Sequence, residues 1–228
     1  MPQAGLSGLG AVLFDLDGTL IDSAPDLAGA LNDLRVARGL GPLPYPLLRA
    51  EVGSGARGMV GLGFGLKPGD DGYDALREDF LARYDARKTQ ETAVFPAVRP
   101  LLAALDRIGL PWGIVTNKAA WLAEPLLAAI GGLERSATLV CGDTMPHAKP
   151  HPAPLLEAAR RLGVPPGRCA YVGDDRRDVQ AGQAAGMRTV VARWGYLGAG
   201  AAVADWGADA IADGPEELAR LLGVSTND

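Results

Sequence analysis

The chain has 228 residues, of which 48% are hydrophobic and 21% are charged, and its formal net charge at pH 7 is -5. This size and composition suit a globular protein with a substantial core, built as one large domain or as a domain with an insertion. Like charges form no block longer than pairs such as Arg160-Arg161 and Arg176-Arg177, which we interpret as solvated helix faces. The electrostatic signature of a nucleic-acid or anionic-membrane binder is therefore absent.

The sequence offers no signal for a membrane or for export. No apolar run approaches the roughly 18 residues that a membrane helix needs. The first residues, MPQAGLSGLG, lack the basic start of a signal peptide. Cys141 and Cys169 both lie in strand-like apolar runs, so we expect buried free thiols rather than a disulfide. We expect a cytoplasmic protein.

The first expected strand is the apolar run AVLF at residues 11–14, which ends directly before Asp15 and Asp17. Carboxylates at the end of a buried strand are costly unless a cation, a proton or hydrogen-bond donors compensate them. The pair therefore predicts compensating groups elsewhere in the chain.

Residues 22–93 carry helical patterns but no convincing strand. An insertion of about 70 residues is far longer than an ordinary connection between two elements. We therefore predict a helical cap domain at 22–93 and a core domain formed by 1–21 and 94–228. The apolar positions at helical spacing in the insertion are Leu27, Ala30, Leu31, Leu34, Leu76, Phe80 and Tyr84.

After the insertion, short apolar runs alternate strictly with helical patterns. Each helical pattern has apolar residues three or four positions apart and ends in a glycine. This alternation predicts a doubly wound α/β fold, in which a parallel sheet is covered by helices on both faces. The expected strands are 112–115, 137–141, 169–173, 189–192 and 209–212, and the expected helices are 98–109, 121–131, 153–163 and 178–186.

Polar residues follow four of the expected strands. The carboxyl ends of neighbouring parallel strands converge on one crevice, so we expect these residues to meet. Carboxylates, a hydroxyl and a lysine gathered in this way can hold a divalent cation and bind an anion, as phosphoryl transfer requires. Each motif alone is more often a turn, a strand end or a surface loop, but their succession favours a site. The residues are Asp15, Asp17, Thr116, Asn117, Lys118, Lys149, Asp174, Asp175 and Asp178.

These four elements, in this order, resemble the haloacid dehalogenase superfamily, and DLDGTLIDS at 15–23 is similar to the first motif of its phosphatases. The resemblance covers essentially the whole chain. It implies a haloacid dehalogenase-like core with an inserted all-helical cap. It also implies a phosphomonoesterase that uses Mg²⁺, acts on a small phosphorylated metabolite and forms an aspartyl phosphate.

The resemblance further implies catalytic roles. Asp15 would be the nucleophile, and Asp17 would protonate the leaving oxygen and later deprotonate the attacking water. Thr116 would donate a hydrogen bond to a phosphoryl oxygen, and Lys149 would neutralise developing charge. Asp15, Asp174 and the carbonyl of Asp17 would hold Mg²⁺.

Other residues of these motifs have roles that the resemblance defines less sharply. Asp178 would contact the metal ligands without binding the metal itself. Asp175 stands where close relatives often have serine, and it would either bind the metal directly or face solvent. Gly18 would let the backbone turn toward the phosphate, and we also place Thr19 and Asn117 among the phosphate-binding residues.

The segment GSGARG at 53–58 satisfies the spacing of a dinucleotide-binding loop but lies in the helical insertion without a preceding strand. We expect a cap loop over the active site, with Ser54 and Arg57 available to distal polar groups of the substrate. The alternative is close helix packing with a solvated arginine. His147 and His151 lack companions for a metal site, so we expect them at the surface.

Within the superfamily, the cap position is similar to that of the phosphoglycolate phosphatase group. Segments such as GARGMVGLGFGL and GDDRRDVQAG resemble bacterial enzymes of that group, some of which are N-acetylmuramic acid 6-phosphate phosphatases of cell-wall recycling. We expect the phosphoglycolate type, with the sugar-acid phosphatase as the alternative, because both substrates carry a carboxylate that Arg57 could meet.

Two further alternatives are less favoured. A phosphosugar mutase has a signature cap loop that is not matched here. A receiver-type phosphoacceptor has its site residues in another order, on a shorter chain without a cap. The sequence predicts neither a monomer nor a dimer.

Overall fold

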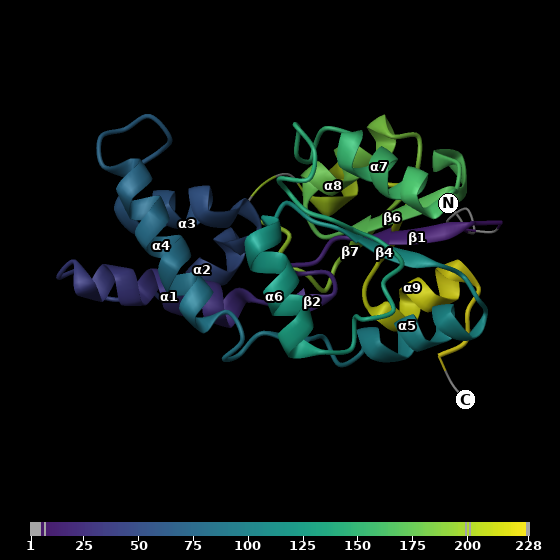
Figure 1. Cartoon of the computed structure of the whole chain (residues 1–228), viewed down its shortest axis with the longest axis horizontal. Helices are drawn as coiled ribbons and strands as arrows, with labels where there is room; N and C mark the ends of the chain where they lie inside the picture. Colours follow the sequence, from purple (N-terminus) through teal and green to yellow (C-terminus); the bar gives the residue numbers. More distant parts are fainter. Residues whose placement is uncertain (1–5, 7, 199, 201, 227–228) are drawn as a thin grey trace.

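A six-stranded parallel sheet forms the centre of the larger part of the molecule (Figure 1). The computed structural model describes residue 6, residues 8–198, residue 200 and residues 202–226. The spatial order of the strands, β5-β4-β1-β6-β7-β8, places the first strand between strands from later parts of the chain. The expected doubly wound α/β fold is confirmed. The strands are β1 (Ala11–Phe14), β4 (Trp112–Val115), β5 (Leu139–Val140), β6 (Cys169–Gly173), β7 (Arg188–Ala192) and β8 (Ala210–Ala212).

Helices cover both faces of this sheet (Figure 1). Val12 and Phe14 pack in the apolar cluster that includes α5 and α9, whereas Ala11 and Leu13 pack in the cluster that includes α7. Successive side chains of a strand point to opposite faces, so a strand buried on both faces needs an unbroken apolar run. The core helices are α5 (Val98–Arg107), α6 (Ala120–Ile130), α7 (Ala153–Leu162), α8 (Arg176–Ala184) and α9 (Pro215–Leu222), with the short turns η2 (Pro166–Arg168) and η3 (Val203–Trp206).

The expected helix ends are confirmed by backbone conformation. Gly109, Gly131, Gly163 and Gly186 have φ values of 68°, 63°, 67° and 71°. A residue with positive φ after the last turn is a common way to end a helix, and glycine adopts it without a steric penalty. The last helix, α9, was not predicted.

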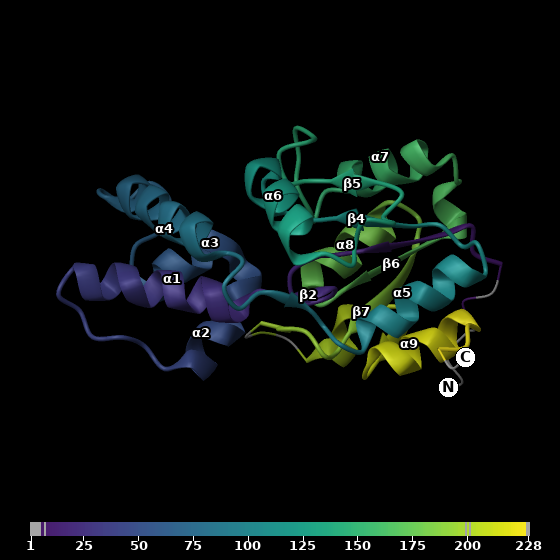
Figure 2. The ribbon, with the colours of Figure 1, turned by 60° about the horizontal axis from the view of Figure 1, so that its bottom comes forward.

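The inserted segment folds into helices with an apolar core of their own. All seven apolar positions expected at helical spacing are buried in the structure. Helices α1 and α4 lie side by side in this part (Figure 2). Its elements are α1 (Ala24–Ala37), α2 (Tyr45–Glu51), η1 (Val52–Ser54), α3 (Gly55–Phe64) and α4 (Tyr73–Arg87). We call this helical part the cap and the sheet with its helices the core.

A short antiparallel ribbon, which was not predicted, lies where the chain enters and leaves the cap. It pairs β2 (Ile21–Asp22) with β3 (Ala93–Val94), with Ile21 opposite Val94. The ribbon lies at the two expected junctions, while the exact division at 22–93 stays a prediction.

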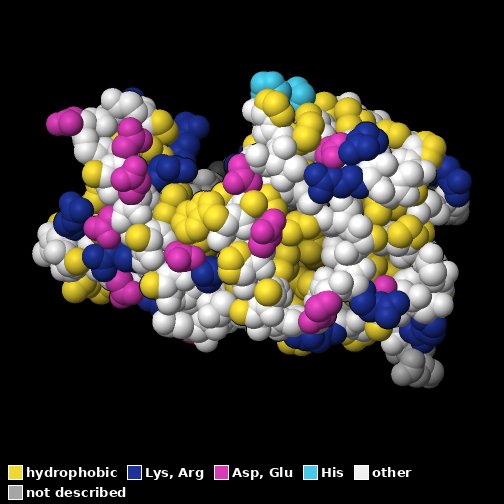
Figure 3. Space-filling view, viewed as in Figure 1, with side chains coloured by type: hydrophobic (Ala, Val, Ile, Leu, Met, Phe, Trp, Pro, Cys, Tyr) yellow, Lys and Arg dark blue, Asp and Glu magenta, His cyan; other side chains and the backbone are white. Residues whose placement is uncertain are grey.

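Three smaller expectations concern the rest of the described chain. Cys141 and Cys169 are buried free thiols, as predicted. His147 and His151 are exposed, with ring centroids 4.5 Å apart, and both appear on the surface in Figure 3. Among the described helices, none combines the length and apolar character that a bilayer-spanning segment requires.

Candidate active site

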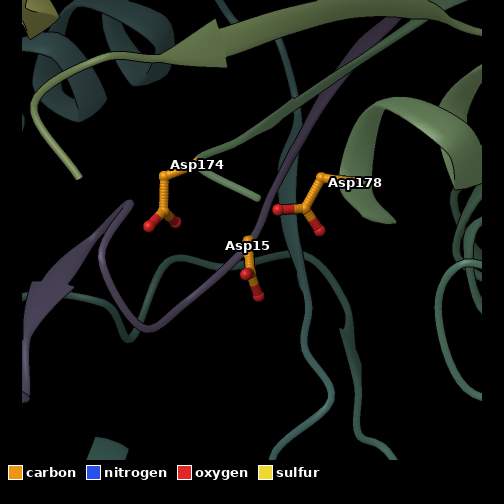
Figure 4. A group of neighbouring side chains, drawn as sticks. All are labelled: Asp15, Asp174 and Asp178. Carbon is orange, nitrogen blue, oxygen red and sulfur yellow. The ribbon is translucent and has the colours of Figure 1, made fainter. Parts of the chain in front are cut away.

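Three carboxylates from separate parts of the core gather at the carboxyl edge of the sheet (Figure 4). Asp15 follows β1, Asp174 follows β6, and Asp178 lies in the first turn of α8. Each offers one oxygen, and these oxygens lie within 4.8 Å of one another. The parallel sheet thus brings together acids that are far apart in the chain. We call this set the carboxylate group.

Among the described residues, Lys149 is the cation that contacts this group. Its Nζ lies 2.8 Å from Asp15 Oδ1 and 2.8 Å from Asp178 Oδ1, and its side chain is 2% exposed. The ammonium also donates to the carbonyl of Val115, at 3.1 Å, and to the hydroxyl of Tyr171, at 2.7 Å. These contacts hold the ammonium between Asp15 and Asp178.

Burial and charge perturb the protonation of these residues. Loss of water contact, opposed by Lys149, raises the pKa of Asp15 from 3.8 to about 7. Burial and the charges of Asp15 and Asp178 raise the pKa of Asp174 well above its usual value. Burial alone would lower the pKa of Lys149, but the two carboxylates beside it hold that pKa above normal. One ammonium does not balance three carboxylates.

The carboxylate group fits a divalent cation. Its donors are all oxygens, which suits Mg²⁺, and a doubly charged ion would supply the missing positive charge. The surroundings of Asp174 are also closely shaped, because a Cβ atom on Gly18 would lie 2.3 Å from Asp174 Oδ2 and one on Gly195 would lie 2.2 Å from Asp174 Cβ. Gly18 has a φ of 84°, which glycine adopts readily.

Thr19 holds Asp174 in place rather than lining the cavity described below. Its hydroxyl donates to Asp174 Oδ1 at 2.8 Å, and the Tyr196 N–H donates to Asp174 Oδ2 at 2.8 Å. Thr19 is fully buried. The structure therefore directs its hydroxyl to Asp174, and a role of Thr19 in phosphate binding stays a prediction.

Thr116 and Asn117 follow β4 and line the cavity. The Thr116 hydroxyl accepts a hydrogen bond from the Lys118 N–H at 3.1 Å. The Asn117 side chain accepts from the Lys149 N–H at 3.0 Å and donates to the Lys149 carbonyl at 3.0 Å. Asn117 thus fixes the backbone of the lysine that contacts the carboxylate group.

Asp17 lies apart from the carboxylate group and has its own partners. Its Oδ1 accepts a hydrogen bond from the Ser23 hydroxyl at 2.5 Å and lies 3.1 Å from Lys118 Nζ. Lys118 also donates to the hydroxyl of Tyr84, at 2.8 Å. Burial would lower the pKa of Lys118, but the nearby Asp17 and Tyr84 hold it above normal. Sequence reasoning named Lys118 but assigned it no role.

A cavity of about 350 Å³ lies between the core and the cap, over these residues. Figure 3 shows the molecule hollowed between the two parts. Ser54, Arg57 and Arg77 reach it from the cap. Among the described residues, neither arginine has an ion pair. The cavity therefore has a carboxylate and lysine floor, with two available cations on the cap side.

We expected the segment 53–58 to form a loop, and this was wrong. It forms the short turn η1 and the first turn of α3. Helix α2 precedes it, where a dinucleotide-binding motif would require a strand. Its residues do line the cavity, which is the position expected for Ser54 and Arg57.

Asp175 is paired with an arginine. It caps the N-terminus of α8, and its carboxylate accepts from the Arg177 backbone N–H at 2.8 Å, from Nε at 2.8 Å and from Nη2 at 2.9 Å. Although burial opposes it, this pairing lowers the pKa of Asp175. Arg177 also donates to the carbonyl of Gly53 in the cap. Interpreting both Arg176 and Arg177 as solvated was wrong, since only Arg176 is exposed.

Comparisons with known proteins find matches that cover both the core and the cap of this chain. The family model of haloacid dehalogenase-like hydrolases matches residues 9–186. The chain is 43% identical over 214 residues to the N-acetylmuramic acid 6-phosphate phosphatase of Pseudomonas aeruginosa, covering 94% of this chain and 95% of that one. It is 43% identical over 208 residues to the phosphoglycolate phosphatase of Xanthomonas campestris pv. campestris, covering 91% and 94%. The crystal structure of a protein described as a predicted phosphoglycolate phosphatase from Haemophilus somnus matches with a TM-score of 0.83 at 27% identity, covering 95% and 99%.

Proposed function

Because the chain belongs to the haloacid dehalogenase-like hydrolases, we propose that it is a Mg²⁺-dependent phosphomonoesterase that works through an aspartyl phosphate on Asp15. Relatives named as phosphatases, at 43% identity, support phosphoric monoester hydrolysis. The observation that carries the proposal is the contact of Lys149 Nζ with Asp15 Oδ1, at 2.8 Å, inside the carboxylate group.

The partners of Asp15 suit a nucleophile. Oδ1 accepts from the Leu16 N–H at 2.7 Å and contacts Lys149, whereas Oδ2 has no hydrogen-bond partner among the described residues. Oδ2 attacks the phosphorus, and the bond from phosphorus to the substrate oxygen breaks. Asp17 gives its proton to that leaving oxygen, Thr116 donates a hydrogen bond to a phosphoryl oxygen, and the Lys149 ammonium offsets the developing negative charge.

The second step returns the enzyme to its starting form. Asp17, now ionised, removes a proton from a water molecule as that water attacks the phosphorus. The bond from phosphorus to Asp15 Oδ2 breaks, and inorganic phosphate leaves. When bound by Asp15, Asp174 and the main-chain carbonyl of Asp17, Mg²⁺ would offset the negative charge shared by the carboxylates and the phosphate.

The cavity favours a sugar-acid phosphate over a two-carbon acid phosphate. Its volume of about 350 Å³ lies in the range that encloses ligands much larger than 2-phosphoglycolate. Phe80, Trp121 and Leu122 supply apolar and aromatic lining, which suits a sugar ring with its substituents. Arg57 and Arg77 are placed to meet a carboxylate. The sequence favoured the phosphoglycolate type, with N-acetylmuramic acid 6-phosphate as the alternative substrate. For these reasons we propose N-acetylmuramic acid 6-phosphate as the preferred substrate.

A hydrolysis panel with Mg²⁺ tests both the activity and the substrate. It compares N-acetylmuramic acid 6-phosphate, N-acetylglucosamine 6-phosphate and 2-phosphoglycolate by the rate of phosphate release. We expect N-acetylmuramic acid 6-phosphate to have the highest kcat/KM. The kcat/KM of N-acetylglucosamine 6-phosphate, which lacks the carboxylate, should be lower by about 10- to 100-fold, because an arginine of the cap would be left without its carboxylate partner. A higher kcat/KM for 2-phosphoglycolate would return the substrate to the phosphoglycolate type.

Arg57→Ala separates recognition from chemistry in the same panel. We expect it to raise KM for N-acetylmuramic acid 6-phosphate and to leave p-nitrophenyl phosphate, which has no carboxylate, unchanged. An equal loss on both substrates would remove this role from Arg57. The cytoplasmic location stays a prediction.

A further inference from the structure

Lys118 connects the proposed acid and base of the core to the cap. Its Nζ lies 3.1 Å from Asp17 Oδ1 and 2.8 Å from the hydroxyl of Tyr84, which lies in α4. The same ammonium lies 4.5 Å from the centroid of the Tyr84 ring. The Lys118 side chain is 6% exposed, so water competes little for these contacts. One buried charge is therefore shared between a core carboxylate and a cap aromatic residue.

The contacts of Asp17 hold one of its oxygens and leave the other available. Oδ1 takes both the Lys118 contact and the hydrogen bond from the Ser23 hydroxyl. Oδ2 has no hydrogen-bond partner among the described residues, and Asp17 lines the cavity. Two anchors on one oxygen fix the plane and direction of a carboxylate, so its free oxygen can be aimed at a substrate atom.

The two anchors depend on different parts of the molecule. Ser23 follows β2, and its backbone N–H is fixed by the Tyr196 hydroxyl, at 2.8 Å, so this anchor belongs to the junction with the core. Lys118 finds its second partner, Tyr84, only where α4 of the cap lies against the loop after β4. Moving the cap away would release Lys118 from Tyr84 and loosen one of the two anchors of Asp17.

We propose that Lys118 is a positioning residue that aims Asp17 at the leaving oxygen while Tyr84 of the docked cap holds it. This inference rests on the proposed phosphatase function and deepens it. It predicts that Lys118 and Tyr84 act mainly on protonation of the leaving group, not on binding of the phosphate. Docking of the cap and proton transfer are thereby coupled through one ammonium.

Aryl phosphates of similar shape test this coupling. Phenyl phosphate releases a weakly acidic phenol that needs protonation, whereas p-nitrophenyl phosphate releases a far more acidic phenol that needs little. We expect Lys118→Met to lower kcat/KM about 100-fold for phenyl phosphate and less than about tenfold for p-nitrophenyl phosphate, since general acid catalysis is worth about 10² or more. Tyr84→Phe keeps the ring and removes the hydroxyl, so it should show the same pattern with smaller losses.

Lys88→Met is the matched control, because Lys88 follows α4 but pairs with Asp85, at 2.5 Å, outside the site. We expect it to leave both rates unchanged. Equal losses on the two aryl phosphates in Lys118→Met or Tyr84→Phe would overturn the proposal, as would no loss in either variant. Wild-type protein that hydrolyses neither compound would overturn the proposed function as well, which distinguishes the two failures.

Discussion

Asp15 is the residue whose replacement tests the proposed chemistry most directly. Asp15→Asn replaces a carboxylate oxygen by an amide group, which is a poor nucleophile, so we expect the rate of phosphate release to fall by at least about 10³-fold. The variant should remain folded, because the change removes one negative charge from a crowded group of three carboxylates. Steady-state kinetics and thermal unfolding followed by circular dichroism measure the two effects. Hydrolysis within tenfold of the wild-type rate would reassign the nucleophile.

Some of the site residues were predictable from the sequence and others were not. Asp15, Lys149 and Asp174 each follow an apolar strand, and this position predicts the sheet edge where they meet. Tyr171 was missed because it reads as an ordinary strand residue, although its hydroxyl accepts a hydrogen bond from Lys149. Lys118 was assigned no role because its partners lie 101 and 34 positions away in the chain and in different parts of the fold. Such pairings are set by tertiary contacts that no local pattern records.

Helix α8 of the core and the turn η1 of the cap are joined by one arginine, Arg177. Arg177 is held in a fork by Asp175 and donates to the carbonyl of Gly53. A planar guanidinium can serve a carboxylate and a carbonyl at once, and an ammonium in its place would not keep this geometry. The pair therefore clamps the cap segment that carries Ser54 and Arg57 to the edge of the cavity.

Arg177→Ala tests this clamp, and Arg176→Ala is its control on the same helix turn. We expect Arg177→Ala to lower kcat/KM for the preferred substrate about tenfold, mainly through KM, because the cap residues are less well positioned. Its thermal unfolding temperature should change little, since the partly exposed pair contributes little stability. Arg176 is exposed, so its replacement should leave kinetics unchanged. Identical kinetics of the two variants would exclude the clamp.

Helices and strands that are long enough to show a clear apolar pattern were predictable from the sequence, and shorter elements were not. Helices α1 and α4 of the cap carry apolar residues at helical spacing and were expected, as were the strands with unbroken apolar runs. The ribbon of β2 and β3 has two residues in each strand, too few for any period to appear, and it forms because the ends of the cap segment meet in space. Its existence depends on the completed fold.

The apolar clusters of the core and of the cap flank a cavity whose floor carries unbalanced negative charge. The core and cap clusters are largely separate, and between them lie Lys149 and the three carboxylates. A protein can tolerate such a set when the folded state binds a cation, because a ligand that binds only the folded state stabilises it by mass action. The fold and the metal site should therefore be thermodynamically linked.

This linkage predicts that Mg²⁺ raises the thermal unfolding temperature, and more at pH 8 than at pH 6. Without metal, the pKa of Asp15 rises from 3.8 to about 7 on folding, so the folded state binds more protons than the unfolded state between these values. The free energy of unfolding therefore falls as pH rises through this window. Mg²⁺ binds the ionised carboxylates and so restores stability where protons no longer do.

Thermal scans with Mg²⁺ and with a chelator at each pH measure the shift. Asp174→Asn should abolish it, and Asp175→Asn, which alters the neighbouring residue outside the carboxylate group, should retain it. A shift of the same size in both variants would place the ion elsewhere.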